Sequence, residues 1–207
     1  MSEQTPLDLL DPAAVRKRAR TVAVGALIVA AAFGGLLGLL AGRTAGLVAA
    51  VAVGAPLLLL AWAEARRRVW LEGHVLSVRA FGTRSVDLRA ADQLDLLVTD
   101  VRGARTVGLF VRGGGKAINL ALAIYAGTGG REQGVLGLRR LADVLAGRGD
   151  APGLVFSELL VAQLRAEARG LAAADRPLYQ LGSLAPGGRL AQKLNPDAIS
   201  RFVSTLD

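Results

Sequence analysis

Two long uncharged segments near the N-terminus constrain this chain more than any other feature. Residues 21–42 and 44–63 contain no Asp, Glu, Lys or Arg, and only Arg43 separates them. Each segment has about the 20 residues that an α-helix needs to cross a hydrocarbon layer of about 30 Å. The linker Gly42-Arg43-Thr44 is long enough only for a tight turn. The two segments therefore predict a transmembrane helical hairpin over residues 21–64.

The basic residues that flank the hairpin predict its orientation. Lys and Arg concentrate on the cytoplasmic side of membrane proteins, so both chain ends are expected in the cytoplasm of a bacterial inner (cytoplasmic) membrane protein. A cleaved signal peptide is the alternative, but a tail of mixed charge (residues 1–20) precedes the first segment and a second segment follows it directly. The residues expected to contact lipid headgroups are Arg16, Lys17, Arg18, Arg20, Arg66, Arg67 and Arg68.

Small residues recur every four positions in both segments. They are Gly34, Gly38, Gly42, Gly46, Ala50 and Gly54. Small side chains let helix backbones approach closely in lipid, so we expect the two helices to pack along this stripe. Paired by depth around the turn, Gly42 would lie opposite Gly46, Gly38 opposite Ala50 and Gly34 opposite Gly54. The alternative is that the stripe faces another subunit in a homo-oligomer.

After residue 68 the pattern changes to short alternating segments with Gly-rich turns. The expected strands are residues 69–72, 74–80, 84–89, 93–98, 106–112 and 116–122. Turn signals at such short intervals are typical of a small antiparallel sandwich or barrel. Residues 127–130 are expected to form a loop, and an apolar stripe predicts a helix over residues 133–147, with Gly147 as its stop.

This arrangement resembles bacterial membrane-anchored pleckstrin-homology-like (PH-like) domain proteins. The residues that suggest it are Gly73-His74-Val75-Leu76-Ser77-Val78-Arg79 and Thr83-Arg84-Ser85-Val86-Asp87-Leu88, within residues 69–122. The resemblance implies a cytoplasmic domain over residues 65–149, built as a bent sheet with a C-terminal capping helix and used for binding or assembly. The expected fold class is thus a membrane-anchored α+β protein, with a helical extension over residues 150–207 that the family does not need.

The extension is expected to contain two helices. The first covers residues 154–174 and ends before Pro177, and the second covers residues 196–206, with Asn195 as its N-cap and Pro196 at its first position. The second helix carries an apolar stripe of Ile199, Phe202, Val203 and Leu206. Such a stripe either docks on its own domain or binds a groove on a partner protein.

The net charge of +8 is concentrated in the domain that follows the hairpin. Residues 65–149 contain 14 basic and seven acidic residues. A basic surface beside an anionic leaflet gains on the order of 1 kcal/mol per residue. Arg79, Arg84, Arg89, Arg102, Arg105 and Arg112 are therefore either solvated surface residues or part of a rim that binds headgroups or phosphate. Because aromatic residues do not alternate with these bases, no nucleic-acid partner is expected.

The residue inventory argues against catalysis and metal binding. The chain has no Cys and a single His, which excludes thiol chemistry and zinc sites of several Cys or His ligands. Gly115-Lys116 lacks the Ser or Thr of a phosphate-binding loop, so a hairpin turn is the better interpretation. We therefore expect no cofactor and a non-enzymatic accessory or scaffold subunit that binds a protein partner. The alternative is a sensor of anionic lipid headgroups.

Overall fold

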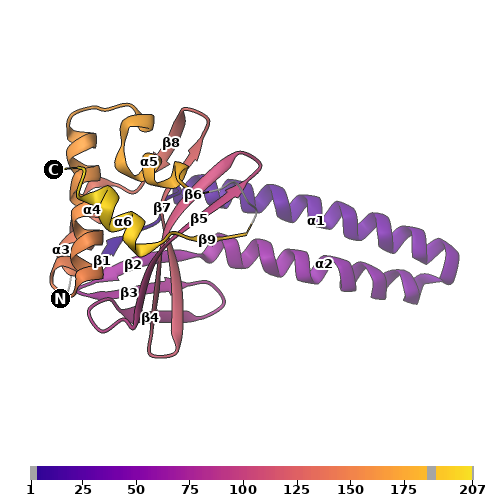
Figure 1. The fold of residues 1–207 in the computed structure, drawn as a ribbon. Helices are drawn as coiled ribbons and strands as arrows, with labels where there is room; N and C mark the ends of the chain where they lie inside the picture. The colour runs from indigo at the N-terminus through magenta and orange to yellow at the C-terminus, as the bar shows by residue number, and fades with distance from the viewer. Residues whose placement is uncertain (1–3, 186–189, 207) are drawn as a thin grey trace. The chain divides into compact units, whose positions relative to one another are not determined.

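The computed structural model describes residues 4–185 and 190–206, with the side chain of residue 12 left out. The chain forms two compact units. Of the described residues, 10–67 and 79–82 form one unit, and 4–9, 68–78, 83–185 and 190–206 form the other, which we call the sheet domain. Two long apolar helices are followed by two antiparallel sheets and C-terminal helices, so the coarse α+β prediction is confirmed (Figure 1).

The elements of the described residues follow one another along the chain as strands, helices and one 3-10 turn. They are β1 (Gln4–Pro6), α1 (Pro12–Ala41), α2 (Arg43–Arg66), β2 (Arg68–Glu72), β3 (Val75–Arg79), β4 (Thr83–Asp87), β5 (Gln93–Val101), β6 (Ala104–Gly113), β7 (Lys116–Ala126), β8 (Gly129–Glu132), α3 (Val135–Ala146), α4 (Ala151–Ala168), η1 (Ala173–Asp175), α5 (Pro177–Ser183), β9 (Gln192–Lys193) and α6 (Pro196–Val203).

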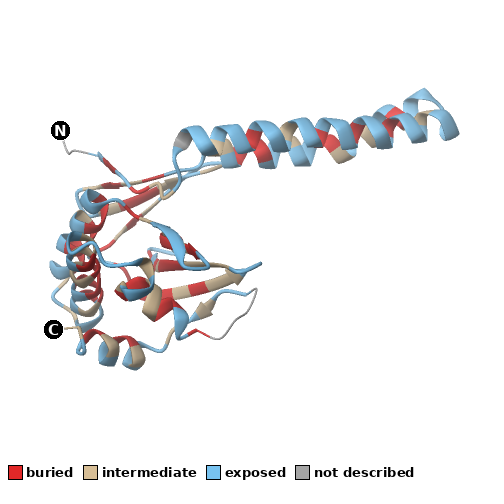
Figure 2. Cartoon of the chain, turned by 90° about the horizontal axis from the view of Figure 1, so that it is seen from above, coloured by how far each residue is buried: buried red, intermediate tan, exposed pale blue. Residues whose placement is uncertain are grey.

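The helical hairpin of α1 and α2 is tighter than the sequence suggests. Asp11 caps α1, because its carboxylate accepts a hydrogen bond from the Ala13 amide at 3.0 Å. Gly42 alone separates the helices, at a φ of 92° that strongly favours glycine. Both helices are long and apolar enough to cross a membrane, and 17% of the most apolar stretch of each is buried. Figure 2 shows exposed residues along most of the hairpin surface.

Residues 4–9 belong to the sheet domain. The sequence predicts a separate tail over residues 1–20, but β1 pairs antiparallel with β2, and the Leu7 amide donates to the Val69 carbonyl at 2.9 Å. Leu7 is 1% exposed in the domain core, and the buried Gln133 amide donates to its carbonyl at 2.7 Å. The helical hairpin is therefore a long connection between two neighbouring strands of one sheet.

Two sheets enclose one hydrophobic core. The strand orders are β1-β2-β3-β4 and β8-β7-β6-β5-β9. All six expected strands are present, β2 to β7, while β1, β8 and β9 were not expected. β8 begins within residues 127–130, which are expected to form a loop, and extends to Glu132. Gly114 and Gly115 have φ of 57° and 72° in the two-residue turn between β6 and β7, the conformation that short hairpins require.

The C-terminal helices complete this core. Leu138, Leu141 and Leu145 of α3 and Phe156, Leu159 and Leu160 of α4 belong to the same buried cluster as the strands. The helix expected over residues 154–174 instead begins at Ala151 and ends at Ala168. Pro177 does not end this helix, because it is the first residue of α5, a position that its missing N–H suits.

Asp150 caps α4 and provides a stability prediction that depends on pH. Its carboxylate accepts from the Gly153 amide at 3.0 Å and from the Arg148 guanidinium at 2.6 Å. Hydrogen bonding from Arg148 is the main reason that the pKa of Asp150 is lowered. Because the folded pKa lies below the unfolded value of about 3.9, this contribution is present above that value and is lost as the pH falls through the folded pKa.

We therefore expect Asp150→Ala to lower the free energy of unfolding by about 1 kcal/mol at neutral pH and to flatten its decline on acidification. Chemical denaturation at several pH values measures both effects. Asp150→Asn is the matched variant, because it keeps a capping oxygen but cannot titrate. If Asp150→Ala shows the same pH dependence as the unmodified chain, the Asp150 carboxylate does not titrate with folding.

Candidate functional site

The small-residue stripe lies between α1 and α2. A Cβ added to Gly46 would lie 2.5 Å from the Gly34 carbonyl oxygen and 2.7 Å from the Gly38 Cα. A Cβ added to Gly34 would lie 2.7 Å from the Ala50 Cβ. Both contacts are closer than real Cβ atoms make, so the two backbones approach as only small residues allow. The stripe packs within one chain in this structure.

The pairing along the stripe differs from the expected one by one helical turn. Gly46 meets Gly38, Ala50 meets Gly34, and Gly54 meets Ala30, whose Cβ would lie 2.9 Å from an added Cβ. Gly42 takes no part, because it is the turn itself and nothing lies within 4 Å of its added Cβ. The expected pairs are centred on residue 44, whereas the observed pairs are centred on residue 42, the one-residue turn. A centre that moves by two residues shifts each opposing position by four.

The predicted headgroup-binding residues all lie at the open end of the hairpin. Arg16, Lys17, Arg18 and Arg20 are exposed in the first turns of α1, and Arg66, Arg67 and Arg68 are exposed where α2 ends and β2 begins. The Arg66 guanidinium lies 4.5 Å from the centre of the Trp62 ring, a cation–π contact. Trp residues are enriched at membrane–water interfaces. Headgroup contact by these residues stays a prediction.

The six arginines considered for a headgroup- or phosphate-binding rim divide into two groups. Arg79, Arg84, Arg89, Arg102 and Arg112 are exposed. Arg105 is partly buried, and its guanidinium lies 3.4 Å from the Asp100 carboxylate. The first group can meet an external anion, whereas Arg105 already has an anionic neighbour.

The apolar stripe of α6 packs on its own domain. Ile199 and Val203 are buried in the core, and Phe202 and Leu206 are partly buried against it. Of the two roles open to these four residues, the structure shows docking, which α6 makes mainly against α4. Binding to a partner would require α6 to leave the core, so we do not place the partner surface there.

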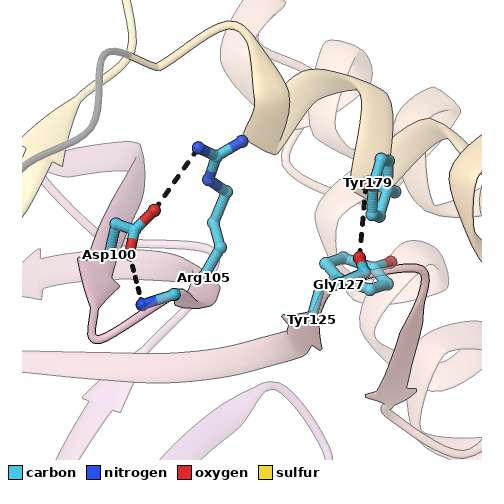
Figure 3. Close-up of a pocket in the computed structure, with 6 residues that line it drawn as sticks. Asp100, Arg105, Tyr125, Gly127 and Tyr179 are labelled. Atoms are coloured by element: carbon cyan, nitrogen blue, oxygen red, sulfur yellow. Dashed lines mark hydrogen bonds and ion pairs between the residues drawn. The ribbon is translucent and has the colours of Figure 1, made fainter.

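The sheet domain contains a polar pocket of about 180 Å³ that the sequence did not indicate. It is lined by Asp100, Gly103, Arg105, Tyr125, Gly127 and Tyr179 (Figure 3). The rings of Tyr125 and Tyr179 meet edge to face, with centroids 5.0 Å apart. These residues come from β5, β6, β7, α5 and two turns, and no local motif connects them.

The polar groups around this pocket are engaged with one another. The Tyr125 hydroxyl donates to the Glu132 carboxylate at 2.6 Å, and that carboxylate also pairs with Arg176. Burial, and then the neighbouring Glu132, raise the pKa of Tyr125 well above its ordinary value. Tyr125 therefore stays protonated at physiological pH and acts as a donor rather than a base. The arrangement suits structural support or weak binding of a small polar group.

The residues considered for phosphate binding and catalysis lie at turns of the sheet domain. Gly115-Lys116 lies at a β-hairpin turn, as predicted. His74 follows Gly73 in the turn between β2 and β3, and its Nε2 lies 3.4 Å from the Asp87 carboxylate at the surface. Within residues 4–185 and 190–206, no three His, Asp or Glu side chains come together as metal ligands.

Comparison with known proteins identifies no relative. No protein-family model matches the chain, and no curated protein or solved structure is significantly similar to it. Its function must therefore be argued from its own residues.

Proposed function

We propose that this chain is a non-enzymatic membrane protein whose helical hairpin anchors a PH-like domain at one membrane face. The observation that carries the proposal is the apolar outer surface of the hairpin. Leu39 is 89% exposed, Leu40 77% and Ile28 65%, beside many other exposed apolar residues of α1 and α2. A contiguous apolar surface of this extent is unfavourable in water and suited to lipid.

Strand pairing supports a hairpin that enters and leaves through the same face of the membrane. β1 precedes α1, β2 follows α2, and the two strands pair in one sheet. Chain segments that hydrogen-bond to each other cannot lie on opposite sides of a bilayer. With seven Lys and Arg residues at the open end and Arg43 at the turn, both ends belong in the bacterial cytoplasm under this proposal.

Cysteine labelling tests the anchor directly, because the natural chain contains no Cys. Thr44→Cys places a thiol at the turn, and Ala117→Cys places one at an exposed site of the sheet domain. In intact bacteria made permeable only in the outer membrane, we expect a membrane-impermeant maleimide to label residue 44 and to reach residue 117 only after lysis. A chain that fractionates as soluble, or equal labelling at both sites, would contradict the anchor.

For the sheet domain we propose a role as an accessory or scaffold subunit of a membrane protein assembly. The resemblance to PH-like domains supports it, as does an exposed apolar pair at the start of α3, Val135 and Leu136, 53% and 61% exposed. We expect gentle purification of the full-length protein at native expression to recover a stoichiometric partner, and Leu136→Asp to release it. Deletion of α6 should instead unfold the domain.

A second candidate, a sensor of anionic headgroups, is favoured by exposed arginines of the sheet domain such as Arg84, Arg89, Arg102 and Arg112. Recovery of the chain alone or as a homo-oligomer with bound anionic lipid would favour this alternative. Recovery with a stoichiometric protein partner would favour the accessory subunit.

A further inference from the structure

The tip of the hairpin between β3 and β4 exposes an aromatic residue between two cations. Ala80, Phe81 and Gly82 connect the strands, and the Ala80 amide donates to the Gly82 carbonyl at 3.1 Å. Phe81 is 67% exposed, and Arg79 and Arg84 on either side are exposed as well. A phenylalanine in this position contributes nothing to the core and leaves apolar surface in water.

The root of the same hairpin is firmly held. Leu76 and Val86 are buried in the core, and the Ser77 and Ser85 hydroxyls lie 2.9 Å apart across the strands. The Leu88 amide donates to the His74 carbonyl at 2.9 Å. The three tip residues are thus presented by an ordered hairpin (Figure 1).

The tip belongs to the same compact unit as the two apolar helices. Residues 79–82 group with residues 10–67, whereas the remainder of β3 and β4 groups with the sheet domain. The exposed end of α2 contributes Arg66 and Arg67 to that unit. Phe81 therefore shares a unit with the surface that would lie in lipid.

We propose that the β3–β4 tip is a second membrane contact, in which Phe81 enters the interfacial layer and Arg79 and Arg84 bind lipid phosphates. This inference rests on the proposed membrane anchor. An aromatic ring gains from leaving water at the interface, and each cation near an anionic surface adds on the order of 1 kcal/mol, about a fivefold effect. The occupant is the bilayer that holds α1 and α2, preferably one with anionic lipid.

Depth-dependent fluorescence quenching of the full-length protein in vesicles tests the contact. A polarity-sensitive dye is attached to Phe81→Cys. Ile28→Cys on α1 is the reference for a site in lipid, and Leu154→Cys on α4 is the control for an exposed site in water. Vesicles contain phosphatidylcholine with or without phosphatidylglycerol, and the quenchers are iodide in water and nitroxide-labelled lipid. We expect the dye at residue 81 to be quenched by the lipid nitroxide, more strongly with phosphatidylglycerol, and the dye at residue 154 to be quenched by iodide.

Replacing both Arg79 and Arg84 by Gln should weaken the docked state of the tip roughly 25-fold on phosphatidylglycerol vesicles, about fivefold for each arginine. High salt should also weaken the docked state of the tip, because salt screens the attraction between the arginines and anionic lipids. A dye at residue 81 that is as accessible to iodide as the dye at residue 154, while residue 28 reports lipid, would overturn the tip contact and leave the anchor intact. If the dye at residue 28 also reports water, the anchor itself fails. If the lipid nitroxide quenches the dye at residue 81 equally with and without phosphatidylglycerol, and equally in the Gln variants, the proposed role of the arginines is overturned.

Discussion

Gly46→Val is expected to separate the two helices of the hairpin. The new Cβ would lie 2.5 Å from the Gly34 carbonyl oxygen and within 3 Å of the Gly38 backbone. These atoms belong to main chain inside a helix, so they cannot rotate away as a side-chain end could. Overpacking of this kind destabilises the packed hairpin by about 1–3 kcal/mol or more. Each increment of about 1.4 kcal/mol lowers the equilibrium constant for helix packing tenfold.

Disulfide formation between Ala30→Cys and Gly54→Cys measures the separation. The two Cβ positions are 2.9 Å apart, so a slight widening reaches the separation of about 3.8 Å that a disulfide needs. We expect Gly46→Val to lower the cross-linking rate at least about tenfold. Gly25→Val and Gly35→Val are the matched controls, because nothing lies within 4 Å of their added Cβ atoms. Unchanged cross-linking in Gly46→Val would mean that the helices do not meet along this stripe.

Leu7→Ala is expected to destabilise the sheet domain although it lies before the first helix. The Leu7 side chain is fully buried and packs against α3 at Gly137. A Cβ added to Gly137 would lie 2.8 Å from the Leu7 Cδ2. Truncating a buried Leu costs about 2–5 kcal/mol because it leaves a cavity. For a chain of this size the melting temperature should fall by roughly 5–15 °C, as followed by near-ultraviolet circular dichroism in detergent.

Leu10→Ala is the control for this prediction, because Leu10 is 38% exposed and lies three residues away. We expect it to change stability by less than about 0.5 kcal/mol. Equal melting temperatures of Leu7→Ala and the unmodified chain would contradict the integration of the N-terminal segment into the core.

Local patterns in the sequence predicted most elements correctly. The two long segments without charged residues predicted α1 and α2. Short alternating segments between glycine-rich turns predicted the six strands from β2 to β7. Asn195 and Pro196 marked the start of α6, where the Asn195 side chain accepts from the Asp197 amide at 2.9 Å. These signals are visible in one sequence because each arises between residues that are near neighbours in the chain.

The elements that were missed depend on distant partners. β1 has three residues and β9 has two, so neither carries a detectable alternation, and each exists because a longer strand offers free backbone groups. The pocket around Tyr125 and Tyr179 likewise joins residues of four elements and two turns. Lys193 of β9 lies 2.7 Å from the buried Asp95 carboxylate, a pairing that spacing along the chain cannot reveal.

The sequence by itself determined where the apolar helices, strands β2 to β7 and the amphipathic C-terminal helix lie, because hydrophobic periodicity and turn residues act locally. Tertiary structure decided how they are used. A one-residue turn at Gly42 set which small residues meet, and the pairing of β1 with β2 brought both ends of the hairpin into one sheet. It also covered the stripe of α6, which the sequence left open to a partner. The hydrophobic effect is not directional, so an apolar stripe can pack on any complementary apolar surface. Only the tertiary structure shows which surface the stripe contacts.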